Sequence, residues 1–262
     1  MKFGFIGTGV ITGAIVTGLL KQEGAAHEFL LSERSSTVSS RLAAASAQVR
    51  VTADNQEIAD QADILFLAVL PQAAEEVLQP LTFRKGQKVV SLIATVTHER
   101  LRGWIGEDVQ ITRAIPLPAV AERRGVTVLY PEDAALSGLF SGLGRAVTAK
   151  TVEEFDAYAA ASALMGTYFG VLETAAGWLA AQGCPEEGAQ AYLTGVFSGL
   201  AQSAEADTGS SFSVLRESHS TPGGLNEQMF QVFDSAGGSK ALAGGLDSII
   251  ARLQAAKEPG GR

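Results

Sequence analysis

The stretch "KFGFIGTGVITGA", residues 2–14, decides which fold is expected for this chain. An apolar run, Lys2–Ile6, is interrupted by Gly7 and Gly9, and apolar residues then recur at helical spacing over Val10–Gln22. A strand, a glycine turn and a helix in this order let a pyrophosphate approach the N-terminus of the helix. The stretch therefore predicts a dinucleotide-binding turn, and the alternative is a tight turn with a structural role only.

The alternation of strand and helix continues through the first half of the chain. Further strands are expected at Glu28–Ser32, Val49–Thr52, Asp63–Val69, Lys88–Ala94, Val109–Pro116 and, as the last convincing strand, Gly125–Tyr130. Helices are expected over residues 36–46, Asn55–Gln61 and Thr97–Ile105, and residues 137–144 read as a helix and a turn. This order predicts an α/β fold whose N-terminal part is a Rossmann-type, doubly wound parallel sheet.

The pattern changes at about Thr151. Long alanine-rich helical stretches are expected at Glu153–Gln182, at Pro185–Ala206 and from Leu225 onwards, and none of the intervening runs resembles a strand. We therefore expect a dinucleotide-binding domain over residues 1–150 and an all-helical domain over residues 151–262.

Composition excludes several classes of function. The net charge of −8, without a cluster of Lys and Arg, argues against a nucleic-acid surface. No segment approaches the length of about 20 apolar residues that a membrane span requires, and the N-terminal apolar run is too short for a signal peptide. Cys184 is the single cysteine, which is typical of a reducing cytoplasm, and three scattered histidines give no metal-ligand spacing. A cytoplasmic protein without a bound metal is expected.

The end of the second strand, "LLSERSS", bears on the choice between two cofactors. A residue at this place contacts the adenosine ribose in dinucleotide-binding folds. Glu33 can accept hydrogen bonds from both ribose hydroxyls, which favours NAD, whereas Arg34 and Ser35 can bind a 2′-phosphate, which favours NADP. We expect NADP and leave NAD open.

A second glycine-containing stretch, "STPGGLNEQMF" at Ser220–Phe230, interrupts the helical half. Gly223 and Gly224 permit a left-handed backbone and expose N–H groups, so the stretch suits an anion at the start of a helix. Asn226 can donate through its amide. The alternative is a turn between two helices in which Asn226 serves as a cap.

Four stretches together resemble the Δ1-pyrroline-5-carboxylate reductase family over nearly the full length of the chain: "GTGVITGAI", "LAVLPQ", "RAIPLPAVAERRG" and "STPGG". Residues 68–72 stand where the family has A-V-K-P-Q, residues 113–125 match R-x-M-P-N-T-P…G, and residues 220–224 match S/T-P-G-G. The chain departs from the family at several positions. Leu70 replaces the lysine, Leu117 and Pro118 replace the asparagine and threonine, Thr95 replaces the glycine of A-G, "LMGTYF" replaces most of G-S-G-P-A-Y, and Asn226 replaces a threonine.

The resemblance implies an NAD(P)H-dependent reductase of a small cyclic imine carboxylate, with pyrroline-5-carboxylate and L-proline as substrate and product. It implies that the P-G-G loop closes over the substrate's carboxylate, and that the helical domain interlocks two subunits in a homodimer or a higher homo-oligomer. Two alternatives stay open: a related reductase of a different imine or a ketone, and a nucleotide-binding protein without turnover.

The resemblance and the ends of the strands together give the candidate site residues. Candidate catalytic donors are Asn226 and Thr221, and candidate substrate-binding residues are Pro222, Gly223, Gly224 and Asn226. Candidate cofactor-binding residues are Gly7, Thr8, Gly9, Val10, Ile11, Glu33, Arg34, Ser35, Ala68, Val69, Leu70, Pro71, Gln72, Ala94, Thr95, Ile115 and Pro116.

Overall fold

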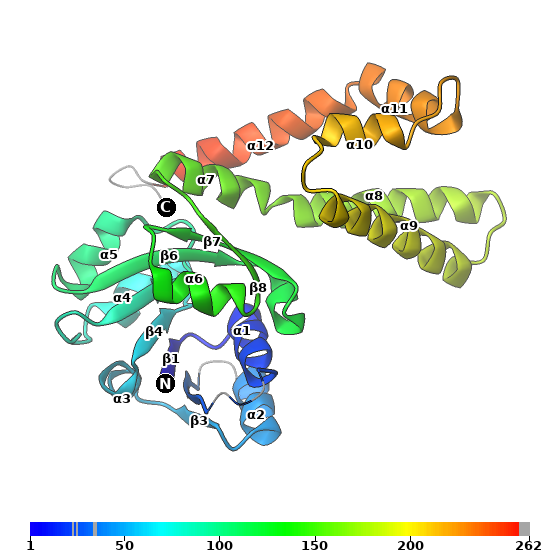
Figure 1. Cartoon of the computed structure of the whole chain (residues 1–262). Coiled ribbons are helices and arrows are strands. Elements are labelled where there is room, and N and C mark those ends of the chain that lie inside the picture. The colour runs from blue at the N-terminus through cyan, green and yellow to red at the C-terminus, as the bar shows by residue number, and fades with distance from the viewer. Residues whose placement is uncertain (23, 25, 34–35, 257–262) are drawn as a thin grey trace. The chain divides into compact units, whose positions relative to one another are not determined.

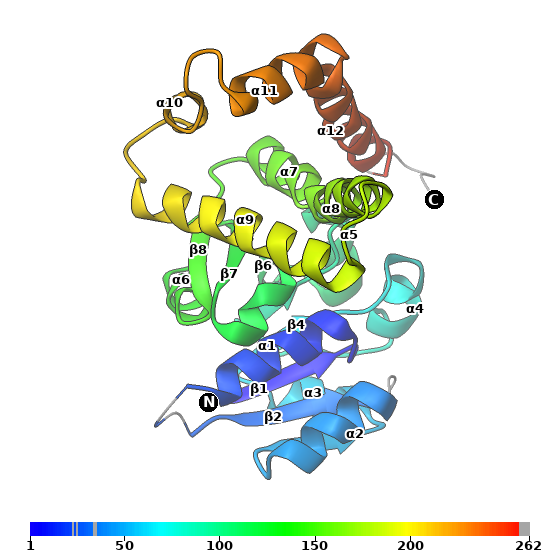
Figure 2. The ribbon, with the colours of Figure 1, turned by 90° about the vertical axis from the view of Figure 1, so that its right-hand side faces the viewer.

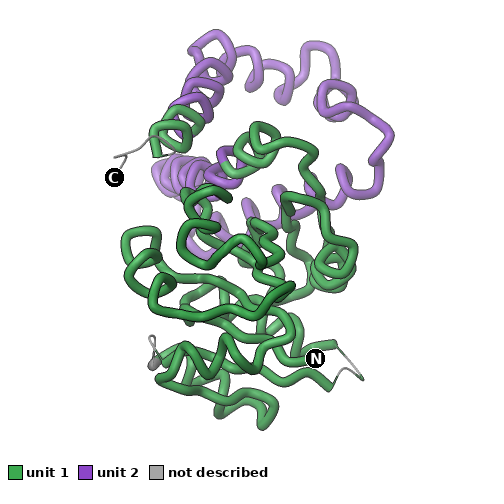
Figure 3. Tube along the Cα trace, turned by 90° about the vertical axis from the view of Figure 1, so that its left-hand side faces the viewer, with its two compact units in different colours: residues 1–159, 250–262 green, residues 160–249 purple. Residues whose placement is uncertain are grey.

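The computed structural model describes residues 1–22, 24, 26–33 and 36–256. The chain forms two compact units (Figure 3). The first unit contains residues 1–159 and the end of helix α12 (Gly238–Ala255) from Ile250 onwards, and the second contains residues 160–249. The division into domains at residue 150 stays a prediction.

The first unit is built on one sheet, whose strands lie in the order β3-β2-β1-β4-β5-β6-β7-β8. Their bounds are β1 Lys2–Ile6, β2 Glu28–Ser32, β3 Val49–Thr52, β4 Ile64–Leu67, β5 Lys88–Ser91, β6 Gln110–Pro116, β7 Gly125–Tyr130 and β8 Gly144–Thr148. Neighbouring described strands are parallel except for β6 and β7, which are antiparallel. The Rossmann-type, parallel-dominated sheet expected from the sequence is confirmed.

Strand β8 was not expected from the sequence, which gave β7 as the last strand. Its sequence, "GRAVT", is short and only half-buried at best, so it lacks the apolar run that marked the other strands.

The short connection between β6 and β7 explains why these two strands are antiparallel. The connection after Pro116 contains only the short 3-10 helix η2 (Pro118–Glu122), and a parallel connection needs a crossover of about a dozen residues or more.

Helices cover both faces of the sheet. Their bounds are α1 Val10–Leu20, α2 Ser36–Ala45, α3 Asn55–Gln61, α4 Ala74–Leu78, α5 His98–Ile105, α6 Ala134–Ser141 and α7 Val152–Ala161. One buried cluster joins α1 and α6 to the sheet through Ile15, Phe66 and Phe140, and a second joins α3, α4 and α5 to the opposite face. Figure 1 shows α3, α4 and α5 on one side of the sheet, and Figure 2 shows α1 and α2 in front of β1 and β2.

The second unit consists of helices. They are α8 Leu164–Ala181, α9 Glu186–Ala206, α10 Phe212–Ser218, α11 Leu225–Ser235 and most of α12. The single helix expected over residues 153–182 is wrong, because Ser162 and Ala163 separate α7 from α8. Helix α10 was not anticipated. Among the described residues, no helix has the combination of length and apolarity needed to cross a membrane.

The helical unit has little core of its own. Helices α8, α10 and α11 contain no buried residue within the described chain, and α9 buries only Ala189. Large apolar side chains are exposed instead, including Phe169 at 66%, Phe212 at 83% and Leu225 at 84%. The uncovered apolar faces agree with the sequence-based expectation for a domain that associates with another copy.

The N-cap of α6 gives a testable pH dependence. The Asp133 carboxylate accepts a hydrogen bond from Leu136 N at 3.0 Å and forms an ion pair with Lys88. Burial acts to raise the pKa of Asp133, but the hydrogen bonds from Lys88 and the backbone outweigh it and hold the pKa below its usual value. A depressed pKa means that the stabilisation is present above the unfolded-state pKa and is lost as the pH falls through the folded-state pKa.

We therefore expect Asp133→Asn, which keeps a capping oxygen but removes the charge, to lower the free energy of unfolding by about 1 kcal/mol near neutral pH. The loss should shrink below about pH 4, where the wild-type carboxyl is also becoming protonated. Urea unfolding at several pH values, with Glu132→Gln at the exposed neighbouring position as control, measures this. An equal loss at all pH values would rule out the charge as its cause.

Candidate functional site

The turn after β1 contains two glycines, and the fold of the chain requires glycine only at the first of them. Gly7 has φ +101°, and a Cβ atom on it would lie 2.4 Å from the carbonyl oxygen of Ala68, so no other residue fits. Gly9 is the N-cap of α1 and is exposed, and a Cβ atom there would meet nothing within 4 Å. Packing within the chain therefore explains Gly7 but not Gly9. An open glycine at a helix N-terminus suits close approach of a phosphate.

Hydroxyl groups hold this turn in place. The N–H of Gly7 donates to Ser32 Oγ at 2.8 Å, and the Thr8 hydroxyl donates to the Ser32 carbonyl at 2.6 Å. The hydroxyl of Thr12, which stands in place of a third glycine, donates to the Gly7 carbonyl at 2.8 Å. The Thr8 side chain is buried, and its hydroxyl joins the turn to the end of β2. The predicted contact of Thr8 with the cofactor stays a prediction.

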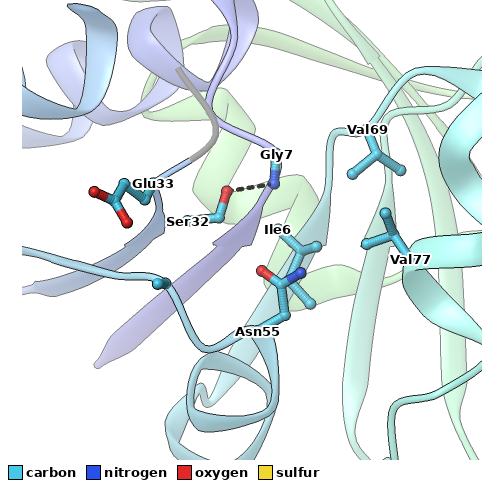
Figure 4. Close-up of a pocket in the computed structure, with 8 residues that line it drawn as sticks. Ile6, Gly7, Ser32, Glu33, Asn55, Val69 and Val77 are labelled. Carbon is cyan, nitrogen blue, oxygen red and sulfur yellow. Dashed lines mark hydrogen bonds between the residues drawn. The ribbon is translucent and has the colours of Figure 1, made fainter. Parts of the chain in front are cut away.

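A cavity of about 320 Å³ opens at the carboxyl ends of β1, β2, β3 and β4. Figure 4 shows Ser32 and Glu33 on one side of Gly7 and Val69 and Val77 on the other, with Asn55 below. The lining residues are Ile6, Gly7, Ser32, Glu33, Ala53, Asn55, Val69 and Val77. Polar groups on one side and apolar groups on the other suit a nucleoside, and this edge of the sheet is where doubly wound folds bind ligands.

The cavity brings together three predicted cofactor residues, Gly7, Glu33 and Val69. It also contains residues that the sequence analysis missed, among them Asn55 and Ser32. The signal for Asn55 was available, because it follows β3 after a short connection and the carboxyl ends of parallel strands meet at one edge. Arg34 and Ser35 lie outside the described residues. The preference for NADP over NAD therefore stays a prediction.

The other candidates near the turn lie on exposed or half-buried backbone. Val10 is 77% exposed and Leu70 is 65% exposed, whereas Ile11 and Ala68 are half-buried. Pro71 and Gln72 are exposed and belong to the short 3-10 helix η1 (Pro71–Ala73), which leads into α4. Proline is favoured at the first position of such a turn, because its missing N–H has no helical partner there.

A buried arginine organises the connection that follows β5. The Arg113 side chain is 3% exposed, its Nη2 donates to the Ala94 carbonyl at 2.8 Å, and its Nη1 lies 3.9 Å from Asp156 Oδ1. The Arg113 guanidinium carbon lies 4.4 Å from the centre of the Phe155 ring. Arg113 therefore joins Ala94, a predicted cofactor residue, to helix α7.

The four residues predicted to form an apolar wall beside a nicotinamide ring differ in their exposure to solvent. Ala94 is exposed and Thr95 is half-buried. Ile115 is half-buried against a small core that includes Phe155, and Pro116 is buried where β6 pairs with β7. Ala94, Thr95, Ile115 and Pro116 are not among the residues that line the cavity at Gly7, and their role stays a prediction.

Two ionisable side chains of the first unit, Arg113 and His98, have lowered pKa values. Burial lowers the pKa of Arg113, and the negative charge of Asp156 opposes this shift. Burial, followed by the charges of Arg102 and Arg113, lowers the pKa of His98. His98 is half-buried, and its Nδ1 has no hydrogen-bond partner among the described residues. An arginine within an apolar strand, "QITRAIP", was the available signal for this cluster.

In the second unit, the P-G-G loop connects α10 to α11. Gly223 has φ +71°, and its N–H donates to Glu227 Oε2 at 2.6 Å. The N–H of Gly224 donates to the Thr221 carbonyl at 2.8 Å. Both N–H groups are thus engaged within the loop, in contrast to the expectation that they are free for an external anion. Thr221 and Pro222 are exposed.

Asn226 is also engaged within the second unit, as in the alternative of a turn between two helices. Its amide Nδ2 donates to the carbonyl oxygen of His219 at 2.7 Å, which joins the first turn of α11 to the end of α10. The side chain is exposed, so one amide hydrogen and the amide oxygen remain for other contacts. His219 itself is exposed at the C-cap of α10.

Known proteins resemble both halves of the chain. Residues 2–95 match the family model described as NADP oxidoreductase coenzyme F420-dependent, and residues 152–256 match the model described as pyrroline-5-carboxylate reductase dimerisation. The chain is 26% identical over 260 residues to pyrroline-5-carboxylate reductase of Haemophilus influenzae, which covers 95% of each chain.

Solved structures of the same kind superpose over almost the whole length. A 1-pyrroline-5-carboxylate reductase from Streptococcus pyogenes gives a TM-score of 0.82 at 23% identity and covers 97% of this chain and 98% of that one. Pyrroline carboxylate reductase of Plasmodium falciparum with NADP bound gives 0.83 at 15% identity and covers 98% of both. At these identities, the solved structures establish the fold.

Proposed function

Because the chain belongs to the pyrroline-5-carboxylate reductase family, we propose that it reduces pyrroline-5-carboxylate to L-proline with a reduced nicotinamide dinucleotide. The observation that carries this proposal is the combination of two features in one chain. A glycine turn with an open N-cap follows β1, and a P-G-G loop precedes α11 within the region that matches the dimerisation model.

The residues of the first unit fit the dinucleotide. Gly9 leaves room at the N-terminus of α1 for a pyrophosphate, and Gly7 and Val69 line a cavity of about 320 Å³ beside Glu33. In this proposal the turn from Gly7 to Ile11 holds the pyrophosphate, and Glu33 contacts the adenosine ribose. When bound, the reduced nicotinamide supplies the hydride. We propose NADP as the cofactor, with NAD as the alternative.

The remaining candidate residues complete this cofactor site in the proposal. Residues 68–72, after β4, lie along the same edge of the sheet, and Ala94, Thr95, Ile115 and Pro116 are the proposed wall beside the nicotinamide ring. Arg34 and Ser35 are the proposed partners of a 2′-phosphate. Positioning and exclusion of water are the main contributions of such residues to hydride transfer.

The P-G-G loop of the second unit is the proposed site for the substrate's carboxylate. Pro222, Gly223 and Gly224 shape the loop, and Thr221 and Asn226 are the candidate hydrogen-bond donors to the substrate. Reduction adds a hydride to the carbon of the protonated C=N bond, whose electron pair moves to nitrogen. Since the imine takes its proton from water, the loop has to orient the ring rather than supply an acid.

The proposal extends to assembly and location. The uncovered apolar faces of α8–α11 and the match of residues 152–256 to a dimerisation model support a homo-oligomer, with a homodimer as the smallest form. The single cysteine and the net charge of −8 support a cytoplasmic protein that acts on a small molecule rather than on nucleic acid.

A reductase of a different imine is the second candidate. Leu70, Leu117 and Pro118 replace polar residues of the family pattern, and Leu70 is 65% exposed. Apolar side chains at these positions favour a less polar substrate. Measuring the turnover of pyrroline-5-carboxylate beside that of other cyclic imines distinguishes the two candidates.

The test is oxidation of NADPH and NADH by the purified protein, followed by absorbance, with pyrroline-5-carboxylate and other cyclic imines as substrates. We expect turnover with pyrroline-5-carboxylate and at least about a ten-fold loss of kcat/KM in Asn226→Ala. Gln228→Ala, at an exposed neighbouring position on α11, is the control. Cofactor binding without turnover of any imine would contradict the proposal and favour a nucleotide-binding protein without catalysis.

A further inference from the structure

The loop proposed to hold the substrate's carboxylate already holds a carboxylate of this chain. Glu227, in the first turn of α11, accepts the hydrogen bond from the N–H of Gly223 at 2.6 Å. This is a charge-assisted contact of the kind that a bound substrate would make with the same N–H. Glu227 therefore occupies the N–H of Gly223 in the structure.

An ordinary helix cap does not account for this contact. In a capping box, the glutamate at the third helical position accepts from the N–H of the N-cap residue. The N-cap of α11 is Gly224, yet the N–H of Gly224 donates to the Thr221 carbonyl. Glu227 reaches past the N-cap to Gly223, where φ is +71° and only the glycine backbone adopts this conformation readily. The hydrogen bond between Glu227 and Gly223 thus depends on the backbone conformation of the P-G-G loop.

The basic residues of the second unit are too few to neutralise its carboxylates, among them that of Glu227. Residues 160–249 contain two basic residues, Arg216 and Lys240, against nine acidic ones. Arg216 lies over the Phe230 ring at 4.5 Å and is 3.2 Å from Glu217 Oε1, so it already has a carboxylate partner. A second anion at the loop would meet the negative charge of Glu227 at short range, where repulsion is screened least.

We propose that Glu227 is a specificity-determining residue that competes with the substrate's carboxylate for the N–H of Gly223. This inference rests on the proposed function of the loop. One N–H cannot serve two carboxylates, so an imine carboxylate must displace Glu227 before it binds, whereas an imine without a carboxylate has no need to. Glu227 thereby raises the KM of carboxylated imines relative to that of the unsubstituted ring, 1-pyrroline, and leaves the chemical step alone.

The test compares Glu227→Gln and Glu227→Ala with the full-length protein. Glutamine keeps an oxygen that accepts from Gly223 but carries no charge, and alanine removes both. We expect the KM for pyrroline-5-carboxylate to fall about five- to ten-fold in Glu227→Ala and by a smaller factor in Glu227→Gln, with kcat unchanged. The KM for 1-pyrroline should stay within about two-fold of the wild-type value. Glu187→Gln, at an exposed position in the first turn of α9, is the matched control.

A binding measurement separates this inference from the proposed function. Calorimetric titration with L-proline in the presence of oxidised cofactor needs no turnover, and its Kd should fall by the same factor in Glu227→Ala. Unchanged or weaker binding of L-proline in both variants would show that Glu227 supports the loop and would overturn the inference. Failure of the wild-type protein to turn over pyrroline-5-carboxylate, with tighter binding of L-proline in the variants, would overturn the proposed function alone.

Discussion

Gly9→Ala is expected to weaken the binding of NADPH at least about ten-fold and to leave the free energy of unfolding nearly unchanged. A Cβ atom on Gly9 would meet nothing within 4 Å in this chain, so the methyl group costs no packing. It would instead occupy the space at the N-terminus of α1 through which a pyrophosphate approaches the backbone.

Gly7→Ala provides the contrast. A Cβ atom on Gly7 would lie 2.4 Å from the Ala68 carbonyl oxygen, at a residue whose φ is +101°. The chain must therefore distort, and we expect a loss of about 2–4 kcal/mol in unfolding free energy together with loss of cofactor binding. Urea unfolding and fluorescence titration with NADPH measure both properties. If Gly9→Ala binds NADPH as tightly as the wild type, the turn has a structural role only and the cofactor binds elsewhere.

Arg113→Ala is expected to destabilise the first unit by about 3–5 kcal/mol, because it removes the positive charge that faces the buried Asp156 carboxylate. The substitution also removes the hydrogen bond to the Ala94 carbonyl and the contact with the Phe155 ring. Arg113→Lys keeps a charge but not the planar group that makes these contacts at once, so a smaller loss is expected.

The double variant Arg113→Leu/Asp156→Leu tests the cause. Removing both charges takes away the buried carboxylate together with the cation that faces it, so this protein should unfold at a higher urea concentration than the single variant Arg113→Leu. Exposed Arg102→Leu on α5 is the control for a lost surface arginine. A double variant less stable than the single variant would show that Asp156 stabilises the unit through contacts other than its pairing with Arg113, and would contradict the charge balance as the cause.

The sequence predicted the sheet because local patterns and topology agree there. Strands β1, β2, β3 and β7 begin and end at the predicted residues, since each is a short run of strand-forming residues. Strand β8 was missed because it is a short edge strand whose position depends on its parallel pairing with β7. The break at Ser162 and Ala163 was missed because alanine-rich sequence on both sides favours helix throughout.

The candidate site was predicted where backbone conformation determines the residue, and missed where distant contacts determine it. The glycine turn and the P-G-G loop are visible in the sequence because few residues adopt positive φ. No local pattern shows that Glu227 binds Gly223, that Arg113 binds Ala94, or that Asn55 faces the same cavity as Gly7. These contacts depend on how side chains converge after folding.

Hydride transfer from a reduced nicotinamide to the C=N carbon of pyrroline-5-carboxylate is the reaction proposed for this chain. The most direct measurement uses NADPH deuterated at the transferable position of C4 of its nicotinamide ring and analyses the product by mass spectrometry and NMR. We expect L-proline with one deuterium on the ring carbon that is bonded to nitrogen and does not carry the carboxylate. Proline without deuterium, or no proline while NADPH still binds, would contradict this transfer.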